Sequence, residues 1–480
     1  MSLKKMSFKK NRAITQVQAI IIIVVVLIAA VGVWYLTKPK PTPIPSPSPS
    51  PSPSPSPSPS PSPSPSPSPT PVVEEIKVGA VYPLSGAVTR VVIKDSLDFF
   101  VDYLINDEGG IQSLGGAKVK LVWADDMAKA DLAMAETERL ITQEDCVVII
   151  GGWWSSLTYP IQEVCARYKV VNLNYDSSSP TLLERGYEWF FMAWPHDDFF
   201  GMKQVDFLIE LIEKEGLKDE VKTVGVMVES ALFGQTAGSS WKKYINKAVE
   251  EGRVDWEIVE DITFAAPVVD VTPEVLKMMA ADPDLLFMCP MAPADCVKVM
   301  TAMMEQDYYP PITMTMDAGF TMWDYWQIEE MRKESIYFFS RFGAGNLMDQ
   351  IEKVPKLKEI YDLWMEEFDY FEFGVLSTYM GVLSLKEALE EAGMNDPNME
   401  DFTTAIRDAF RTIHISQEEA GMYGVDFNDE TGFNDLCEIL IGQNLPDPKN
   451  PDDVDYQTVW PWELAVTDAI IPDPRSRGLG

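Results

Sequence analysis

The sequence predicts an α/β protein with parallel central sheets, preceded by a membrane anchor and a proline-rich stalk. Three observations lead to this fold class. Strand-like and helix-like patterns alternate from residue 76 onward, which is the order that βαβ units produce. The strand-like stretches are mostly continuous apolar runs, as expected where helices cover both faces of a sheet. An uncharged apolar stretch and a Pro/Ser repeat come before all of them.

The N-terminus predicts one membrane-spanning helix. Residues 1–16 hold five basic residues and no acid, and residues 17–36 carry no charge. About 20 apolar residues cross a bilayer, and the basic flank predicts a cytoplasmic N-terminus with everything beyond Leu36 outside the cell. A cleaved secretory signal and pilin-like cleavage after KKNR are the alternatives. No A-x-A site follows for the first, and the apolar anchor would survive the second.

Residues 37–73 predict an extended linker. Pro and Ser alternate over most of this stretch, and proline lacks the N–H that a helix or a sheet needs. A polyproline II stalk spans about 3.1 Å per residue, so it would hold the following domain well away from the membrane. Extracellular stalks of this composition are often O-glycosylated. The anchor and the stalk together are typical of an archaeal or Gram-positive cell-surface protein.

The exported part is strongly acidic. Seven of the 39 Lys and Arg residues precede Val72, which leaves 32 against all 74 acids, an excess of 42 negative charges. This charge favours solubility and excludes nucleic acid as a partner.

Motifs for catalysis, cofactors and metals are absent from the sequence. It has two His and lacks G-x-S-x-G, H-E-x-x-H and Walker A patterns, so we expect no enzyme and no cofactor. In DFNDETGFND the glycine, Gly432, stands at position seven, whereas an EF-hand requires it at six, so no metal site is expected. Of the five Cys, the pairs Cys146–Cys165 and Cys289–Cys296 are the candidate disulfides.

The elements that follow the stalk can be placed in order. The first helix has apolar residues at helical spacing and ends at Gly109 and Gly110. Strands are predicted over 76–84, 118–126, 146–152, 169–175, 221–230 and 285–290. Helices are predicted over 94–110, 129–143, 158–168, 238–252 and 295–306.

Two neighbouring strand ends carry serines. GGWWSS closes one strand at residues 151–156, and NYDSSSP follows the next strand at residues 174–180. Ligands of parallel sheets bind at the carboxyl ends of strands, where helix N-termini offer free N–H groups to an anion. Taken alone, the serines of either junction can be explained by ordinary helix capping, which at the first junction would be done by Ser155 or Ser156. Together, at matching places, they favour a cradle for a polar head group, with tryptophans as its wall.

The order of several motifs resembles the branched-chain amino-acid (Leu/Ile/Val) and amide binding proteins of ABC importers, which have the type I periplasmic-binding-protein fold. IKVGAVYPLSGAV is similar to the family's opening strand and turn, and the block from INDEGG to CVVIIGG is similar to its most characteristic region. ALFGQ, STYMGVLSLKEALEEAG and VDFNDETG are similar to later family motifs. The resemblance covers nearly all of residues 76–465.

The resemblance implies two Rossmann-like lobes joined by three crossovers, which are expected near 194–199, 313–319 and 412–417. One lobe would comprise residues 76–196 and 317–414, and the other would comprise residues 197–316 and 415–460. A C-terminal tail would follow at 461–480. The lobes of family members close around a ligand, and the closed form docks on a permease.

The resemblance also implies site residues. Ser155, with Ser156 beside it, and Ser177 with Ser178 match positions that meet a ligand carboxylate, and Phe233 matches an aromatic that covers the ligand. Asp295 is the candidate for the acid that meets a ligand ammonium, and Asp317 is the second choice. Apart from the resemblance, Trp154 would wall the cleft or pack in the core, and Arg90, in an opening loop that departs from the family, would line the cleft or lie on the solvated surface.

The function that follows is capture of a small amino acid, branched-chain or otherwise apolar, for delivery to an ABC permease and its ATPase subunits. Amides, urea-like solutes and short carboxylates remain open as ligands, because no acid aligns cleanly with the family's ammonium-binding position. A ligand sensor is a further alternative. Only about a dozen residues are expected inside the cell, so a sensor would have to signal through a partner protein.

Overall fold

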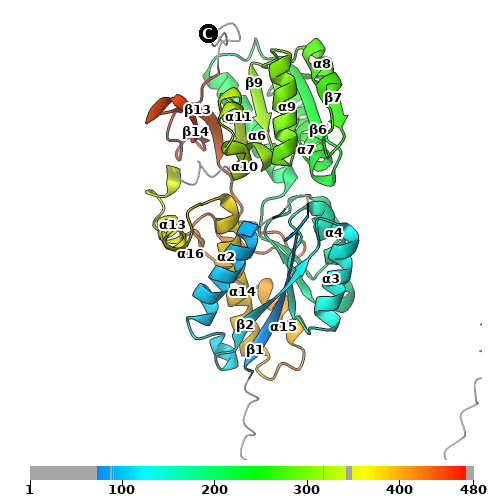
Figure 1. Cartoon of the computed structure of the whole chain (residues 1–480), viewed down its shortest axis with the longest axis vertical. Coiled ribbons are helices and arrows are strands. Elements are labelled where there is room, and N and C mark those ends of the chain that lie inside the picture. The colour runs from blue at the N-terminus through cyan, green and yellow to red at the C-terminus, as the bar shows by residue number, and fades with distance from the viewer. Residues whose placement is uncertain (1–72, 87–88, 90, 317, 342–348, 472–480) are drawn as a thin grey trace, which may run out of the picture. The chain divides into compact units, whose positions relative to one another are not determined.

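The computed structural model describes residues 73–86, 89, 91–316, 318–341 and 349–471. The predicted anchor and stalk, Arg90 and Asp317 lie outside this part of the chain. Within it, no helix is long and apolar enough to cross a membrane. The predicted α/β class with parallel sheets is confirmed, because the described residues form two large sheets with helices packed on them (Figure 1).

The first lobe is built on a five-stranded sheet in the order β2-β1-β3-β4-β5, and all neighbouring strands are parallel. Its strands are β1 Glu75–Tyr82, β2 Lys118–Asp125, β3 Val148–Gly151, β4 Val171–Asn174 and β5 Phe190–Met192. Its helices are α2 Val91–Val101, α3 Ala130–Thr142, α4 Ser155–Tyr168, α5 Thr181–Glu184, α14 Phe373–Asn395 and α15 Phe402–Phe410. Two short helical turns, η1 Asp102–Asn106 and η2 Gln112–Leu114, lie between α2 and β2.

The apolar side chains of these strands pack on both faces of the sheet. In β1, Val78 and Ala80 pack in the cluster that includes Leu97 of α2 and Leu385 of α14. Val81, which points to the other face, packs in a separate cluster with residues of α3 and α4. Alternate side chains of a strand point to opposite faces, so a strand covered on both sides has to be apolar throughout.

The second lobe is built on a seven-stranded sheet in the order β14-β13-β10-β9-β8-β6-β7. The neighbours from β7 to β10 are parallel, and β13 and β14 add antiparallel. Its strands are β6 Thr223–Glu229, β7 Glu257–Phe264, β8 Leu285–Cys289, β9 Ile312–Thr315, β10 Phe339–Arg341, β13 Ile441–Asp447 and β14 Asn450–Trp460. Its helices are α6 Asp197–Lys214, α7 Leu232–Glu250, α8 Thr272–Ala281, α9 Pro293–Glu305, η3 Ala318–Thr321, α10 Trp323–Trp326 and α11 Glu329–Glu334.

Two of the three predicted crossovers lie elsewhere. Strand β10 pairs with β9 and β13, so the segment 318–341 belongs to the second lobe and not to the first. The short strands β11 His414–Ile415 and β12 Val425–Asp426 pair with each other. Just after them, Asn434 donates its N–H to the carbonyl of Met192 in β5 at 3.0 Å. The segment up to about residue 435 therefore stays with the first lobe. The last helices of that lobe are α13 Pro355–Glu367 and α16 Gln417–Ala420.

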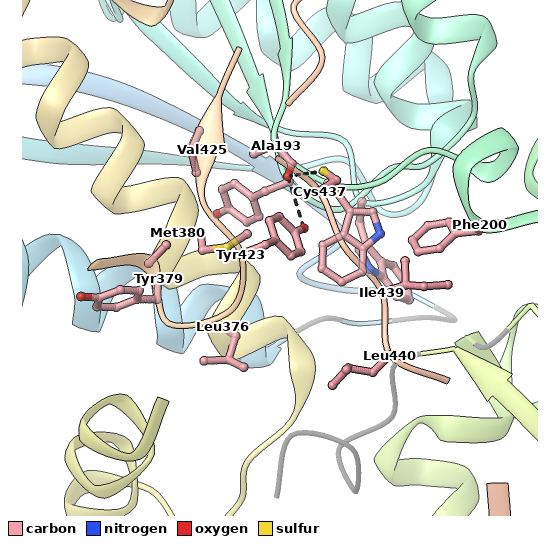
Figure 2. Close-up of a cluster of buried hydrophobic side chains, with 14 of the residues drawn as sticks. Ala193, Phe200, Leu376, Tyr379, Met380, Tyr423, Val425, Cys437, Ile439 and Leu440 are labelled. Atoms are coloured by element: carbon pink, nitrogen blue, oxygen red, sulfur yellow. Dashed lines mark hydrogen bonds between the residues drawn. The ribbon is translucent and has the colours of Figure 1, made fainter. Parts of the chain in front are cut away.

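The first and third crossovers are joined by buried contacts (Figure 2). The carbonyl of Ala193 accepts a hydrogen bond from the Tyr423 hydroxyl at 3.3 Å and one from the Cys437 thiol at 3.6 Å. All three residues are buried, and burial raises the pKa of Cys437 well above its usual value. Cys146 and Cys165 are likewise buried free thiols, so the candidate disulfide between them is not formed.

Candidate functional site

The two serine-bearing junctions follow β3 and β4, which are adjacent in the first sheet. Gly151 and Gly152 end β3 with φ of 153° and 84°. A Cβ on Gly152 would lie 2.2 Å from the hydroxyl oxygen of Thr158. Glycine is therefore required here for the close approach between the strand end and α4.

Helix α4 begins at Ser155, and Trp154 is its N-cap residue without a side-chain capping bond. The predicted capping by Ser155 or Ser156 is therefore wrong. The Ser155 hydroxyl instead links the two junctions, because it accepts the N–H of Ser179 at 3.2 Å. The first N–H groups of a helix have no partners within it, so this uncapped N-terminus retains its capacity to bind an anion.

A buried hydrogen-bond network fixes the two junctions to each other. The Asn174 side chain donates to the carbonyls of Gly151 at 3.1 Å and Gly152 at 3.0 Å, and it accepts the N–H of Ser177 at 3.0 Å. The Ser177 hydroxyl donates to the carbonyl of Gly152 at 2.6 Å and also contacts the hydroxyl of Thr158. This network fixes the positions of the serines at both junctions.

A cavity of about 50 Å³ lies in front of these junctions. Residues of both lobes line it, and most of them are hydroxyl-bearing, aromatic or methionine side chains. They are Trp153, Trp154, Ser155, Asp176, Ser177, Ser178 and Trp194 from the first lobe and first crossover, and Phe233, Met291, Met322 and Arg341 from the second lobe.

The structure thus brings five of the predicted site residues together, namely Trp154, Ser155, Ser177, Ser178 and Phe233. Their predicted part in ligand binding remains a prediction.

Two predicted residues that the structure describes do not line the cavity. Ser156 is exposed on the outer side of α4. Asp295 is buried in the first turn of α9, where its carboxylate accepts the N–H of Val268 at 3.0 Å and lies 3.5 Å from the Lys298 ammonium. Its side chain is therefore used to fix the loop before α8.

Several residues of the cavity wall were missed from the sequence. Arg341 is buried at the end of β10, with its guanidinium 3.2 Å from the ring centre of Phe200 and its Nε donating to the carbonyl of Met316 at 2.9 Å. The sequence signal that could have identified Arg341 is its position as a lone arginine within the aromatic stretch YFFSRFG. Asp176 accepts the Tyr82 hydroxyl at 2.9 Å. Burial, helped by the Asp176 charge, raises the pKa of Tyr82 well above its usual value.

Two buried carboxyl groups stand close to this wall. Asp197 donates its N–H to the carbonyl of Ser178 at 2.6 Å, and its side chain accepts the Thr236 hydroxyl. Burial raises the pKa of Asp197 to about 7, although hydrogen bonds from Thr236 and Ser178 and the charge of Arg341 oppose the rise. Burial likewise raises the pKa of Glu229, the last residue of β6, to about 7.

Comparison with known proteins gives one family and many similar folds. A model of the family described as "Periplasmic binding protein" matches residues 75–435. An "Amino acid binding protein" of Pseudomonas aeruginosa is 29% identical over 143 residues, which cover 30% of this chain and 36% of that protein. The chain therefore matches only about a third of that relative's length.

Solved structures share the fold at low identity. A putative branched-chain amino acid ABC transporter protein from Silicibacter pomeroyi has a TM-score of 0.66 at 15% identity, over 83% of this chain and 99% of that chain. A substrate-binding protein from Desulfitobacterium hafniense, in complex with Leu, has a TM-score of 0.60 at 17% identity, over 80% and 100%. A solute binding protein from R. palustris, in complex with 4-hydroxybenzoate, has a TM-score of 0.64 at 13% identity, over 84% and 100%.

Proposed function

We propose that this chain, which belongs to the periplasmic binding protein family, captures a small apolar amino acid for an ABC importer. Membership of that family makes it a binding protein and not an enzyme. The amino acid, branched-chain or otherwise apolar, would bind between the two lobes. The lobes would close on it and deliver it to a permease with its ATPase subunits.

The observation that carries this proposal is that hydroxyl-bearing and apolar side chains line the same cavity from the two lobes. Ser155, Ser177 and Ser178 line it from the first lobe, where Ser155 begins α4. Hydroxyls and helix N-terminal N–H groups are suited to hold a carboxylate. Phe233 and Met291 line the wall from the second lobe, where an apolar side chain would be buried.

The names of relatives agree with an amino-acid ligand. The Pseudomonas aeruginosa relative is called an amino acid binding protein, and the Desulfitobacterium hafniense structure holds Leu. The location of the protein is part of the proposal. Residues 17–36 would anchor the chain in the membrane with its N-terminus inside, and the stalk of residues 37–73 would let the binding lobes reach the permease at a raised local concentration.

An aromatic carboxylate is the second candidate ligand. Four aromatic residues line the cavity, and the rings of Trp153 and Trp154 lie stacked with centroids 5.3 Å apart. Flat rings bury large areas against such a wall. The R. palustris protein, which has the same fold, holds 4-hydroxybenzoate.

A thermal-shift screen of the full-length chain would test the proposal. The ligands would be Leu, Ile, Val, 4-hydroxybenzoate, acetamide and urea. A ligand at a hundredfold excess over its Kd stabilises the folded state by about 2.7 kcal/mol. We expect stabilisation by Leu, Ile or Val. A shift with 4-hydroxybenzoate alone would favour the second candidate, and a shift with acetamide or urea alone would contradict both.

Two serine variants would locate the site. Ser155→Ala removes a hydroxyl that lines the cavity, whereas Ser156→Ala removes the exposed hydroxyl of the next residue. A hydrogen bond to a charged group contributes about 1.5–3 kcal/mol, so Ser155→Ala should weaken binding by about 10-fold to 100-fold. Ser156→Ala should bind like the wild type. Equal losses in both variants would contradict the proposed site.

A further inference from the structure

A second cavity of the chain is larger than the one described above. Its volume is about 530 Å³, against about 50 Å³ for the first cavity. The two cavities share no lining residue in the described part of the chain. Small-molecule sites occupy roughly 300–1,000 Å³, so the second cavity has room for a ligand of its own.

Both lobes and the third crossover form the wall of this second cavity. The second lobe contributes Lys203 and Glu210 of α6 and the segment 460–464 at the end of β14. The first lobe contributes Leu357 of α13, and the third crossover contributes residues 438–440 (Figure 2). An occupant would therefore contact both lobes beside this crossover.

Two indole rings supply the aromatic part of the wall. Trp460 and Trp462 both donate their Nε1–H to Oε2 of Glu210, at 3.1 and 2.8 Å. The Lys203 ammonium lies 5.9 Å from the ring centre of Trp460. The ammonium of Lys214, which does not line the cavity, lies 4.7 Å from the ring centre of Trp462. The faces of indole rings attract cations, so these rings favour a ligand that is positively charged.

The charged groups of the wall are mostly acids. Glu210, Glu438 and Glu463 line it, and Lys203 is the one base among the described lining residues. The Lys203 ammonium is paired with the Glu438 carboxylate at 3.3 Å. The wall therefore has two more negative than positive charges, and such a wall attracts a cation and repels an anion.

A buried acceptor in the wall lacks a donor. Gln350 lines the cavity and is 3% exposed. Its Nε2 donates to the carbonyl of Leu464 at 3.0 Å, whereas its Oε1 is buried without a hydrogen-bond partner among the described residues. A buried acceptor without a partner is costly. The last torsion of a glutamine side chain is broad, so a small rotation would bring Oε1 to a donor in the cavity.

We propose that this cavity is a second binding site, which takes an organic ammonium ion with an apolar body. The ammonium would donate to Oε1 of Gln350 and lie near the Glu210 carboxylate. These two groups are bonded to Leu464 and Trp462, which are two positions apart in the chain. The apolar body would pack on the indole rings and on Leu357. The proposal does not depend on which ligand the first cavity takes.

The test compares three probes that share one apolar body and differ in charge. They are 4-phenylbutylammonium, 4-phenylbutan-1-ol and 4-phenylbutanoate, titrated by calorimetry into the full-length chain. A charged donor makes the stronger hydrogen bond, and the wall has an excess of acids. The ammonium should therefore bind at least about 10-fold more tightly than either of the other probes.

Two variants and one control locate the site. Glu210→Gln removes a charge but keeps an oxygen for the two indole N–H groups, so it should weaken binding of the ammonium by about 2-fold to 5-fold and leave binding of the alcohol unchanged. Gln350→Leu removes Oε1 and should weaken binding of the ammonium by about 10-fold. The Leu464 carbonyl then keeps the Lys353 ammonium as a donor at 3.1 Å. Glu213→Gln removes an exposed charge one turn along α6, outside the wall, and should bind like wild type.

Several results would overturn the proposal. If wild type bound none of the probes, or bound the alcohol or 4-phenylbutanoate as tightly as the ammonium, the cavity would not select a cation. Unchanged binding of the ammonium in both Glu210→Gln and Gln350→Leu would place the probe elsewhere. Equal losses in Glu210→Gln and Glu213→Gln would show only a general effect of charge. If Gln350→Leu did not fold, the comparison of Glu210→Gln with Glu213→Gln would decide.

Discussion

Replacing Asn174 by leucine should both destabilise the first lobe and loosen the ligand cradle. Asn174 is 1% exposed at the end of β4, and its side chain bonds Gly151, Gly152 and Ser177. Leucine has nearly the same shape but makes none of these bonds. The variant therefore removes the polar link between the two junctions with little change in packing.

The cost can be worked out bond by bond. The Gly152 carbonyl keeps the hydroxyls of Thr158 and Ser177 as donors. The Ser177 N–H and the Gly151 carbonyl lose the Asn174 side chain, and each buried group without a partner costs about 1–3 kcal/mol. With two such groups, we expect Asn174→Leu to lower the free energy of unfolding by about 2–6 kcal/mol.

Asn172→Leu is the matched control on the same face of β4. The Asn172 side chain is also buried, but it makes one hydrogen bond, to the carbonyl of Ile149 at 3.2 Å, and its Oδ1 is without a partner among the described residues. Leucine removes that unsatisfied oxygen, so the net change in stability should be below about 1 kcal/mol.

Urea unfolding of the full-length chain, followed by circular dichroism, would give both free energies, and calorimetry would give the affinities. Asn174→Leu should also bind ligand more weakly, because Ser177 is no longer fixed. Equal stability losses in the two variants, or a larger loss for Asn172→Leu, would refute the reasoning that the junction network supports the site.

Three further predictions follow from the same geometry. Gly152→Ala should cost a few kcal/mol of stability in urea unfolding, because it combines a φ of 84° with a contact 2.6 Å from the Cα of Thr158. Gly216→Ala should cost only about 1–2 kcal/mol, because its φ is 72° but nothing lies within 4 Å of the added Cβ; equal costs would contradict this account. Phe233→Ala should weaken ligand binding by about 1–3 kcal/mol in calorimetry while the fold is kept, since it removes one apolar wall; unchanged affinity would place the ligand elsewhere. Asp197→Asn should flatten the pH dependence of stability. Folding raises the pKa of Asp197 from 3.8 to about 7, so the stability that the protonated group contributes is fully present below about pH 4 and is lost as the pH rises to about 7. A stability difference between the variant and wild type that stayed constant across that pH range would contradict this.

The first lobe could be predicted from sequence because its determinants are local. Its first four strands are short stretches rich in apolar residues, each next to a helix pattern, and parallel pairing brings consecutive strand ends to one edge. The serines of the two junctions are therefore neighbours as soon as the strands are recognised. For these strand ends, no contact between distant segments had to be foreseen.

The second-lobe wall could not be predicted, because it depends on pairing between distant segments. Strand β10 has three residues, ends in Arg341, and is recognisable only through its partners β9 and β13. The sequence also could not show which of the acids near strand ends is already bonded to another part of the chain. Asp295 and Glu229 both follow or end apolar strands, and only the contact with Val268, 27 positions from Asp295, shows that Asp295 is engaged.

The serines at the two first-lobe junctions and the start of α7 are connected through Asp197, a buried residue of the first crossover. The N–H of Asp197 donates to the carbonyl of Ser178, and its carboxyl accepts the hydroxyl of Thr236, one turn along α7 from Phe233. Its carbonyl accepts the Ser240 hydroxyl of the same helix at 2.8 Å. The start of α7 therefore cannot move away from the first-lobe serines unless these bonds break. For the proposed ligand to enter this cavity, an opening motion would then either rotate about Asp197 or displace the side chains of Phe233 and Met291. Hinges are a few residues at element ends that absorb the change in backbone angles, and the short stretch between Met192 and Asp197 has this position between the two sheets.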